Sequence, residues 1–170
     1  MNDITFRPAQ PPDAARIVEM SQSVGVHEGC PVSALTAQQF TQHCFGDSPL
    51  FECYVLDAKD DGLVGHVSFC KGFDFQEACP TIWIADLWVE PDWRSKGLAT
   101  LLMTEVARQA RISGSDVVQW MMAQDNTDAD AFYKSIGARK DGGRPMFLPI
   151  TEITRLAEHA DSRILAQQDR

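Results

Sequence analysis

The sequence lacks several features that would assign a protein to a special class. It has no run of about eighteen apolar residues, so we expect no transmembrane helix. The opening residues, MNDITFRP, lack the apolar stretch of a secretory signal peptide. Repeats, low-complexity tracts and linkers rich in glycine or serine are also missing. Since 170 residues is the size of one ordinary domain, we expect a single domain over residues 1–170.

Cysteines at metal-ligand spacing are absent as well. The chain has five cysteines, an odd number, and none of them form a C-x-x-C pair: Cys30, Cys44, Cys53, Cys70 and Cys79. We therefore expect neither a disulfide framework nor a zinc site, and we predict no metal. Buried or half-buried free thiols suit a reducing compartment, so the sequence indicates a cytoplasmic protein.

Basic runs are missing too, and the formal net charge is -9. A strongly acidic domain without a basic patch repels nucleic acid, so we expect no nucleic-acid partner. The same charge favours a cationic or neutral partner.

The residues that are present predict alternating strands and helices. Apolar periodicity, caps and turn signals indicate strands at 4–7, 51–56, 63–70, 81–89 and 117–123, with another near Phe147, and helices from Pro12, after Thr36, at 98–111, at 128–136 and after Thr151. We expect Gly25 and Gly29 to break the first helix. The apolar strand at 117–123 suggests a central, covered position. The pattern predicts a mixed α/β (α+β) fold, antiparallel in its first half and built from β-α-β units in its second.

A loop between the strand ending at Val89 and the helix starting at Leu98 has the layout of an anion site. The first N–H groups of a helix lack internal partners and lie at its positive end, so they can bind a pyrophosphate. Gly97 allows close approach of the backbone, and Arg94 and Lys96 add positive charge. The loop is too short for a P-loop and lacks the three glycines of a dinucleotide-binding fold.

A second cluster follows from Asn126 to Ala138. Asn126 precedes a helix and can offer its amide to a ligand or to the helix end. Ala129, Phe132 and Tyr133 follow at helical spacing, and we expect Phe132 to pack in the core. Tyr133 is either a packed aromatic or a functional hydroxyl.

Together, R-x-x-G-x-A before a helix and N-x-x-A-x-x-F-Y-x-x-x-G-A further along the chain resemble the GNAT superfamily of N-acetyltransferases. Four segments, LFECYV, DLWVEPDWRSKGLA, DAFYKSIGA and FLPIT, are similar to its diamine (spermidine/spermine) acetyltransferase branch. The similarity extends from Ile4 to about Ala157. It implies a mixed sheet with a bulged, splayed strand, acetyl-coenzyme A as co-substrate, and a homodimer.

The resemblance also implies roles for the donor-side residues. The strand at Leu87, Trp88 and Val89 pairs with the pantetheine arm, and the Leu87 N–H stabilises the oxyanion of the tetrahedral intermediate. Tyr133 is the general acid that protonates the departing thiolate. Asn126 holds the pantetheine side, and Lys134 approaches the adenosine-phosphate end. The amides of Ser95, Lys96, Gly97, Leu98, Ala99 and Thr100 bind the pyrophosphate, and the coenzyme-binding set also includes Arg94 and Ala129.

On the acceptor side the sequence departs from the branch. Ala85 stands where the branch has a Glu that helps to deprotonate the amine, whereas its neighbour Asp86 is kept and is a candidate to bind the ammonium. Glu28 and Asp74 match acidic residues of the acceptor pocket. Candidates for the proton acceptor are Asp86 through water, Glu28 or His27. His66 is interpreted as a packed or hydrogen-bonded histidine.

These residues leave three functions open. The first is acetyl transfer to a small-molecule amine by direct attack, and the second is the same reaction on an amino-acid-like or antibiotic amine. In the second, Arg144, which replaces an aromatic residue of the branch, would pair with a carboxylate. The third is a non-catalytic acetyl-coenzyme A-binding module that regulates a partner. Loss of the branch's Glu at Ala85 favours this third function, whereas retention of Tyr133 disfavours it.

Overall fold

The computed structural model describes residues 4–140, 148–149 and 151–154. The chain forms two compact units, Met1–Ile136 and Gly137–Arg170. In the second unit residues 151–154 are helical, which agrees with the helix expected after Thr151. The strand expected near Phe147, and Arg144 with it, lie outside the described residues.

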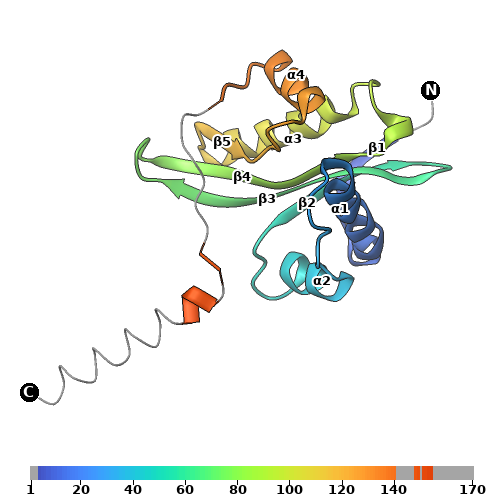
Figure 1. Ribbon diagram of the computed structural model, residues 1–170, viewed down its shortest axis with the longest axis horizontal. Coiled ribbons are helices and arrows are strands. Elements are labelled where there is room, and N and C mark those ends of the chain that lie inside the picture. Colours follow the sequence, from blue (N-terminus) through green and yellow to red (C-terminus); the bar gives the residue numbers. More distant parts are fainter. Residues whose placement is uncertain (1–3, 141–147, 150, 155–170) are drawn as a thin grey trace, which may run out of the picture. The chain divides into compact units, whose positions relative to one another are not determined.

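One five-stranded mixed sheet organises this unit (Figure 1). Its strands lie side by side in chain order: β1 (Ile4–Pro8), β2 (Glu52–Ala58), β3 (Gly62–Asp74), β4 (Cys79–Val89) and β5 (Val117–Trp120). The pairs from β1 to β4 are antiparallel, and β4 pairs with β5 in parallel. The mixed α/β fold expected from the sequence is therefore confirmed.

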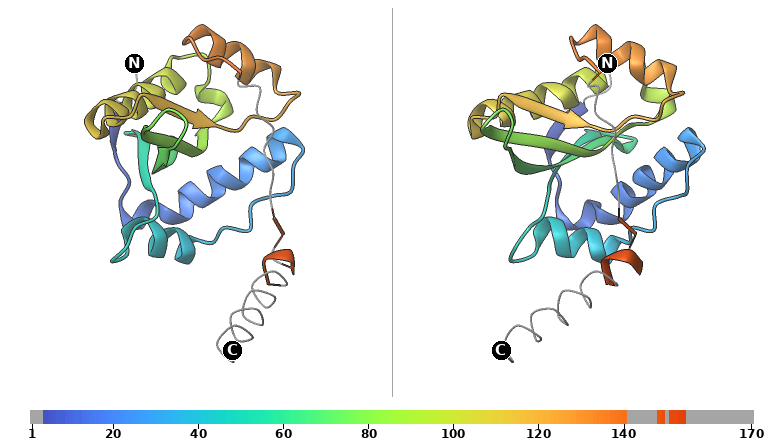
Figure 2. Two further views of the ribbon diagram at one scale, coloured as in Figure 1. Left: turned by 90° about the vertical axis from the view of Figure 1, so that its left-hand side faces the viewer. Right: turned by 60° about the vertical axis from the view of Figure 1, so that its left-hand side comes forward.

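Helices cover both faces of the sheet (Figure 2). On one face lie α1 (Ala14–Glu28), which follows a short 3₁₀ turn at Pro11–Asp13, and α2 (Ala37–Phe45). On the other lies α3 (Leu98–Ser113), which connects β4 to β5, with α4 (Thr127–Ser135) on the same side. A parallel strand pair needs such a crossover helix, so the β-α-β unit is confirmed.

Two buried clusters hold these layers together. The cluster between the sheet and α3 includes Val67, Phe69, Ile82 and Leu102, all fully buried. The cluster under α1 and α2 includes Ile17, Met20, Phe40 and Val55. Because β3 contributes to both clusters, its residues from Leu63 to Phe69 are all buried, including the polar His66 and Ser68.

The first helix is longer than expected. It runs through Gly25 to Glu28 and ends at Gly29, which adopts the left-handed conformation with φ of 64°. The expectation that Gly25 breaks the helix is wrong. A Cβ at Gly25 would lie 2.9 Å from the Pro31 carbonyl oxygen, so glycine is needed there for close approach of the following loop. The second helix starts as expected, with the Thr36 hydroxyl accepting the Gln39 amide at 3.2 Å.

The last described strand is shorter than expected. β5 ends at Trp120, and each of its four residues is half-buried. Among the described strands it pairs with β4 alone, so a central, covered position is not seen in this part of the chain. The early end of β5 leaves the last part of β4 without a described neighbour on that side.

The remaining bulk expectations concern thiols and membranes. All five cysteines are free, and Cys30 is exposed, so the expectation of buried or half-buried thiols fails there. Within the described ranges, no helix has the length and apolar character needed to cross a membrane.

Candidate active site

A β-bulge in β4 sets the geometry of the site. Ser68 of β3 lies opposite Asp86, whereas the next residue, Phe69, lies opposite Ile84. Ala85 is therefore an extra residue on β4 without its own partner on β3. The bulged strand implied by the resemblance is present, and Ala85 is its bulged residue.

The bulge reverses which β4 side chains face which helix layer. Before it, Ile84 belongs to the cluster under α3. After it, Val89 belongs to that cluster and Leu87 packs against it, whereas Trp88 joins the cluster under α1. Side chains alternate with period two, so a single inserted residue exchanges the faces. As a result Asp86 lies on the α1 side of the sheet.

Beyond the bulge, β4 loses its other neighbour. The parallel ladder ends at the pair of Ile84 with Trp120, whereas β4 continues to Val89. Residues 85–89 therefore have no partner on the β5 side among the described strands. A bare strand edge presents main-chain N–H and C=O groups that can pair with an extended ligand.

The start of α3 follows directly after this edge. Gly97 is the N-cap with φ of 80° and Ser95 has φ of 58°, so two residues of the loop adopt the left-handed conformation just before the helix. No side chain caps the helix start, and Leu98 anchors the first turn in the core. A Cβ added to Gly97 would meet no atom within 4 Å. The first amides of α3 thus face open space at the positive end of the helix, as an anion site requires.

Both cations of this loop also bind the loop itself. The Arg94 Nε donates to the Val89 carbonyl at 3.0 Å, and its guanidinium lies 4.6 Å from the centre of the Trp88 ring. The Lys96 Nζ donates to the Asp92 carbonyl at 2.9 Å and lies over the ring of Trp93. These contacts keep two positive charges beside the open amides.

The Asp86 carboxylate sits on a buried histidine. The His66 Nε2 lies 3.3 Å from Asp86 Oδ2, and the His66 side chain is 1% exposed. Burial raises the pKa of Asp86, but hydrogen bonds from His66 and Ser21, the charge of His66 and the Leu87 amide outweigh it, so the pKa lies below its usual value. An ionised carboxylate only accepts, so the His66 Nε2 carries the proton and donates.

Tyr133 lies within electrostatic reach of two acidic groups. Burial, together with the negative charges of Glu28 and Asp86, raises its pKa to about 12. Its ring packs on Trp120 at 4.7 Å and on Phe132 at 5.1 Å between ring centres. Phe132 is half-buried, not a core residue as expected. The Tyr133 phenol is therefore protonated at neutral pH and able to donate.

The end of α1 connects the two halves of the site. The Asn126 Nδ2 donates to Glu28 Oε1 at 2.9 Å, while its Oδ1 accepts the Ala129 amide at 3.0 Å and caps α4. The His27 Nε2 lies 3.4 Å from an Arg94 nitrogen, and its ring packs edge-on against Trp88. Residues predicted for the coenzyme and residues predicted for the acceptor are thus in direct contact.

An acidic pocket of about 290 Å³ lies at this junction. It is lined by His27, Glu28, Ala123, Asp125, Asn126, Thr127 and Asp128. Asp125 and Asp128 were not singled out from the sequence. Both aspartates follow β5, which ends earlier than the sequence indicated, so no local sequence pattern identified them as pocket residues. Three carboxylates in one pocket favour a cationic occupant.

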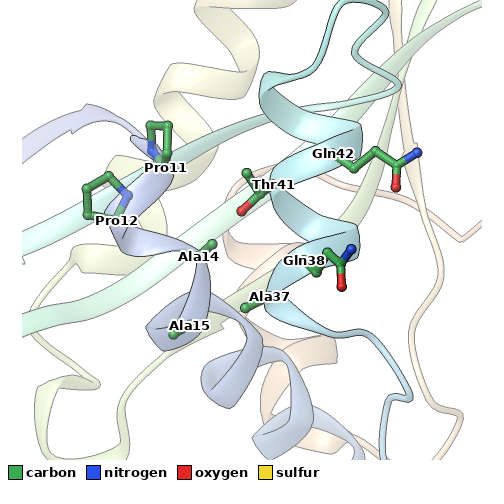
Figure 3. Close-up of a pocket in the computed structure, with 8 residues that line it drawn as sticks. All are labelled: Pro11, Pro12, Ala14, Ala15, Ala37, Gln38, Thr41 and Gln42. Atoms are coloured by element: carbon green, nitrogen blue, oxygen red, sulfur yellow. The ribbon is translucent and has the colours of Figure 1, made fainter.

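A larger hollow of about 600 Å³ lies between the start of α1 and α2, as Figure 3 shows. Its lining consists of prolines, alanines, amides and one hydroxyl: Pro11, Pro12, Ala14, Ala15, Ala37, Gln38, Thr41 and Gln42. No ionisable side chain and none of the predicted site residues line it.

Two predicted residues lie away from this junction. Asp74 is at the β3–β4 hairpin, seven positions along β3 from the Val67–Leu87 pair, which is about 24 Å of extended strand. Its carboxylate accepts two hairpin amides and Gln119 Nε2, so within one chain it serves the hairpin. Lys134 is exposed and pairs with Asp130 on its own helix at 2.8 Å.

Comparison with known proteins agrees with this geometry. The model of the acetyltransferase (GNAT) family matches residues 19–138. An L-ornithine N5-acetyltransferase of Arabidopsis thaliana is 32% identical over 94 residues, which cover 55% of this chain and 41% of that protein. The chain thus spans less than half the length of that relative. A thialysine N-epsilon-acetyltransferase of Sus scrofa is 22% identical over 82% of this chain and 86% of its own length.

Solved structures share the fold. An integron cassette protein of V. cholerae superposes with a TM-score of 0.73 at 18% identity, covering 91% of this chain and 97% of its own. An aminoglycoside acetyltransferase from an uncultured soil sample superposes with a TM-score of 0.67 at 16% identity, covering 86% and 95%. The family match spans well over half of the chain and coincides with the bulged strand, the open helix start and α4. The chain therefore belongs to the GNAT family of acetyltransferases.

Proposed function

We propose that this protein transfers an acetyl group from acetyl-coenzyme A to a primary amine of a small cationic molecule. The observation that carries the proposal is the bare β4 edge, residues 85–89, which leads directly into the uncapped start of α3. An extended arm ending in a pyrophosphate fits this pair of features, because the edge offers strand-like pairing and the helix start offers amides to the phosphates.

On the donor side, main-chain groups do most of the binding. The edge at Leu87, Trp88 and Val89 pairs with the pantetheine arm, and the amides from Ser95 to Thr100 hold the pyrophosphate. The Leu87 N–H is the donor to the thioester oxygen. It also stabilises the Asp86 carboxylate, so a bound ammonium that neutralises Asp86 makes this amide available.

On the acceptor side, Glu28, Asp125 and Asp128 line a pocket that attracts a cation, and Asp86 binds the ammonium. The difference between the pKa of an amine and that of a carboxyl group argues against Asp86 as the final proton acceptor. An alkyl ammonium has a pKa of about 10.4, whereas the pKa of Asp86 lies below the ordinary value of a carboxyl group, so direct proton transfer to Asp86 is strongly unfavourable. The ammonium proton therefore leaves to bulk water, and Asp86, Glu28 and His27 are the candidates to relay it.

The chemistry then needs one bond formed and one broken. The neutral amine nitrogen attacks the thioester carbon, the tetrahedral intermediate collapses, and the carbon–sulfur bond breaks. The departing thiolate takes a proton from the Tyr133 hydroxyl. The second proton of the amine nitrogen is released as the amide forms and returns through water to the Tyr133 phenolate. A pKa of about 12 makes this phenol a weak acid, but two of the causes are the charges of Glu28 and Asp86. A cationic substrate beside them lowers the pKa of Tyr133 and makes the transfer easier.

The acceptor class follows from the pocket and from the named relatives. Relatives that act on ornithine and thialysine, which are amino acids with a side-chain amine, favour basic amino acids, and the branch resemblance favours diamines. Both classes carry the positive charge that the acidic pocket selects.

A homodimer is part of the proposal. It is supported by the resemblance and by apolar side chains exposed on the β3–β4 hairpin, where Phe73 is 55% and Phe75 91% exposed. Sedimentation that gives the monomer mass at micromolar concentration contradicts it.

The test of the catalytic proposal is release of free thiol from acetyl-coenzyme A with ornithine, thialysine, diamines and aminoglycosides. Tyr133→Phe lowers turnover by about 10- to 10⁴-fold if the phenol is the acid. The matched control is Tyr54→Phe, the other tyrosine of the chain, whose hydroxyl accepts from Gln109 at 2.8 Å in the α3 layer. No amine-dependent release refutes the enzyme and favours a coenzyme-binding module, and equal turnover of both variants refutes the role of Tyr133.

A further inference from the structure

The histidine beneath Asp86 has no role in the mechanism so far. His66 lies on β3 opposite Trp88, while Asp86 lies opposite the next residue on the same face, Ser68. The two side chains are thus diagonal neighbours across the ladder. Only the bulge at Ala85 brings Asp86 to this face, so the contact depends on the same local feature that exposes the β4 edge.

The surroundings of His66 are those of a core position. Its neighbour on β2, Val55, is fully buried, and Trp88 is 6% exposed. The His66 Nδ1 is buried without a hydrogen-bond partner in the described part of the chain. An apolar side chain would fill this position without leaving a polar atom unsatisfied. Asp86 is therefore the polar contact that accounts for an imidazole here.

The contact determines what Asp86 offers to a substrate. An ionised carboxylate has about four acceptor positions on its two oxygens. His66 occupies one on Oδ2, and Ser21 and the Leu87 amide also donate to the group. His66 and Ser21 have no other part in the proposed mechanism, so these two donors hold the plane of the carboxylate against rotation and leave its remaining positions to the substrate.

We propose that His66 is a positioning residue for the amine substrate: its Nε2–H holds Asp86 Oδ2 so that the ionised carboxylate presents its other oxygen to the acceptor ammonium. The inference rests on the proposed function, because it assumes that Asp86 binds the amine. His66 itself is too deeply buried to touch substrate and acts through Asp86.

Two substitutions separate this role from simple packing. His66→Gln keeps an N–H near the position of Nε2, whereas His66→Leu fills a similar space without a donor. We expect His66→Leu to raise the KM for the amine about 10- to 100-fold, the loss of one hydrogen bond to a charged group, with the KM for acetyl-coenzyme A unchanged. His66→Gln restores most of the amine KM.

The matched control is Ser68→Ala, which alters another buried polar residue on the same face of β3 and leaves both KM values near the wild type. His66→Leu with a wild-type amine KM overturns the proposal. So does a His66→Gln variant as impaired as His66→Leu, because the site then needs only the shape of the ring.

A measurement on the unaltered protein covers the case in which the variants do not fold. Nitrogen-15 spectra of the His66 ring report its tautomer, and the proposal requires a proton on Nε2 both before and after addition of the amine. A proton on Nδ1 alone overturns it. If wild-type protein releases no thiol with any amine, the proposed function fails, and the tautomer still decides whether His66 holds Asp86.

Discussion

The sharpest test of the coenzyme site is a pair of glycine substitutions at the two ends of one helix. Gly97 precedes α3 with φ of 80°, and Gly114 follows it with φ of 68°. A Cβ would meet no atom within 4 Å at either position. Alanine therefore adds the same backbone strain at both ends, about 1–2 kcal/mol, without a clash. For a chain of this size, that strain lowers the melting temperature by about 2–8 °C in each variant.

The two variants differ in what the methyl group faces. At Gly97 it occupies the space in front of the first amides of α3, where we place the pyrophosphate. At Gly114 it lies at the negative end of the helix, where no anion binds. Loss of charge-assisted hydrogen bonds worth about 1.5–3 kcal/mol raises the KM for acetyl-coenzyme A about 10- to 150-fold in Gly97→Ala alone.

The assay is thiol release at varied acetyl-coenzyme A, combined with thermal unfolding of each variant. The unfolding data show whether Gly97→Ala and Gly114→Ala lose the same stability. If they do, a difference in their KM values for acetyl-coenzyme A reports coenzyme binding alone. If Gly97→Ala and Gly114→Ala have the same KM, the loop does not hold the pyrophosphate and the donor half of the proposal is wrong.

Three further outcomes follow from the structure. The pKa of Asp86 is lower in the folded protein than in the unfolded chain, where it is about 3.9, so the ionised carboxylate stabilises the fold above that pH. This contribution is lost as the pH falls through the folded pKa, so the stability of Asp86→Asn falls less steeply below about pH 4 than that of the wild type. An unchanged acid-unfolding profile refutes the lowered pKa of Asp86. Burial is the largest cause that raises the pKa of Tyr133, to about 12, and it also raises the pKa of Tyr54, so we expect little phenolate absorbance at pH 10. With a cationic amine bound, Tyr133 ionises at a lower pH than in the free protein. Full ionisation of both tyrosines at pH 10 contradicts this prediction. Leu102 is fully buried under the sheet, so Leu102→Ala lowers the free energy of unfolding by about 2–5 kcal/mol in denaturant titration, and a loss well below that means the cavity collapses.

Much of the architecture is local and was readable in advance. The helix at Leu98–Ser113 follows from its apolar stripe and its flanking glycines, and the Thr36 cap follows from its spacing to Gln39. The open start of α3 is also a local property, because a glycine in the left-handed conformation before a helix needs no distant contact to expose the first amides.

The acceptor half was less predictable because it depends on one inserted residue. Nothing in the run from Thr81 to Val89 shows that Ala85 is skipped by β3, and without that bulge Asp86 would face α3 rather than His66. Gly25 gave a similar error. A glycine in the sequence suggests the end of a helix, but Gly25 lies inside α1, where the close approach of Pro31 leaves no room for a side chain.

Residue order alone thus specified the strand–loop–helix that can hold phosphates, since every group involved lies within a few positions of Gly97. Packing decided the rest. Glu28 meets Asn126 across 98 positions of chain, and His66 meets Asp86 across a ladder whose register is offset by a single residue. Such contacts have no periodicity in the sequence, because they arise only when the sheet, its bulge and the end of α1 come together.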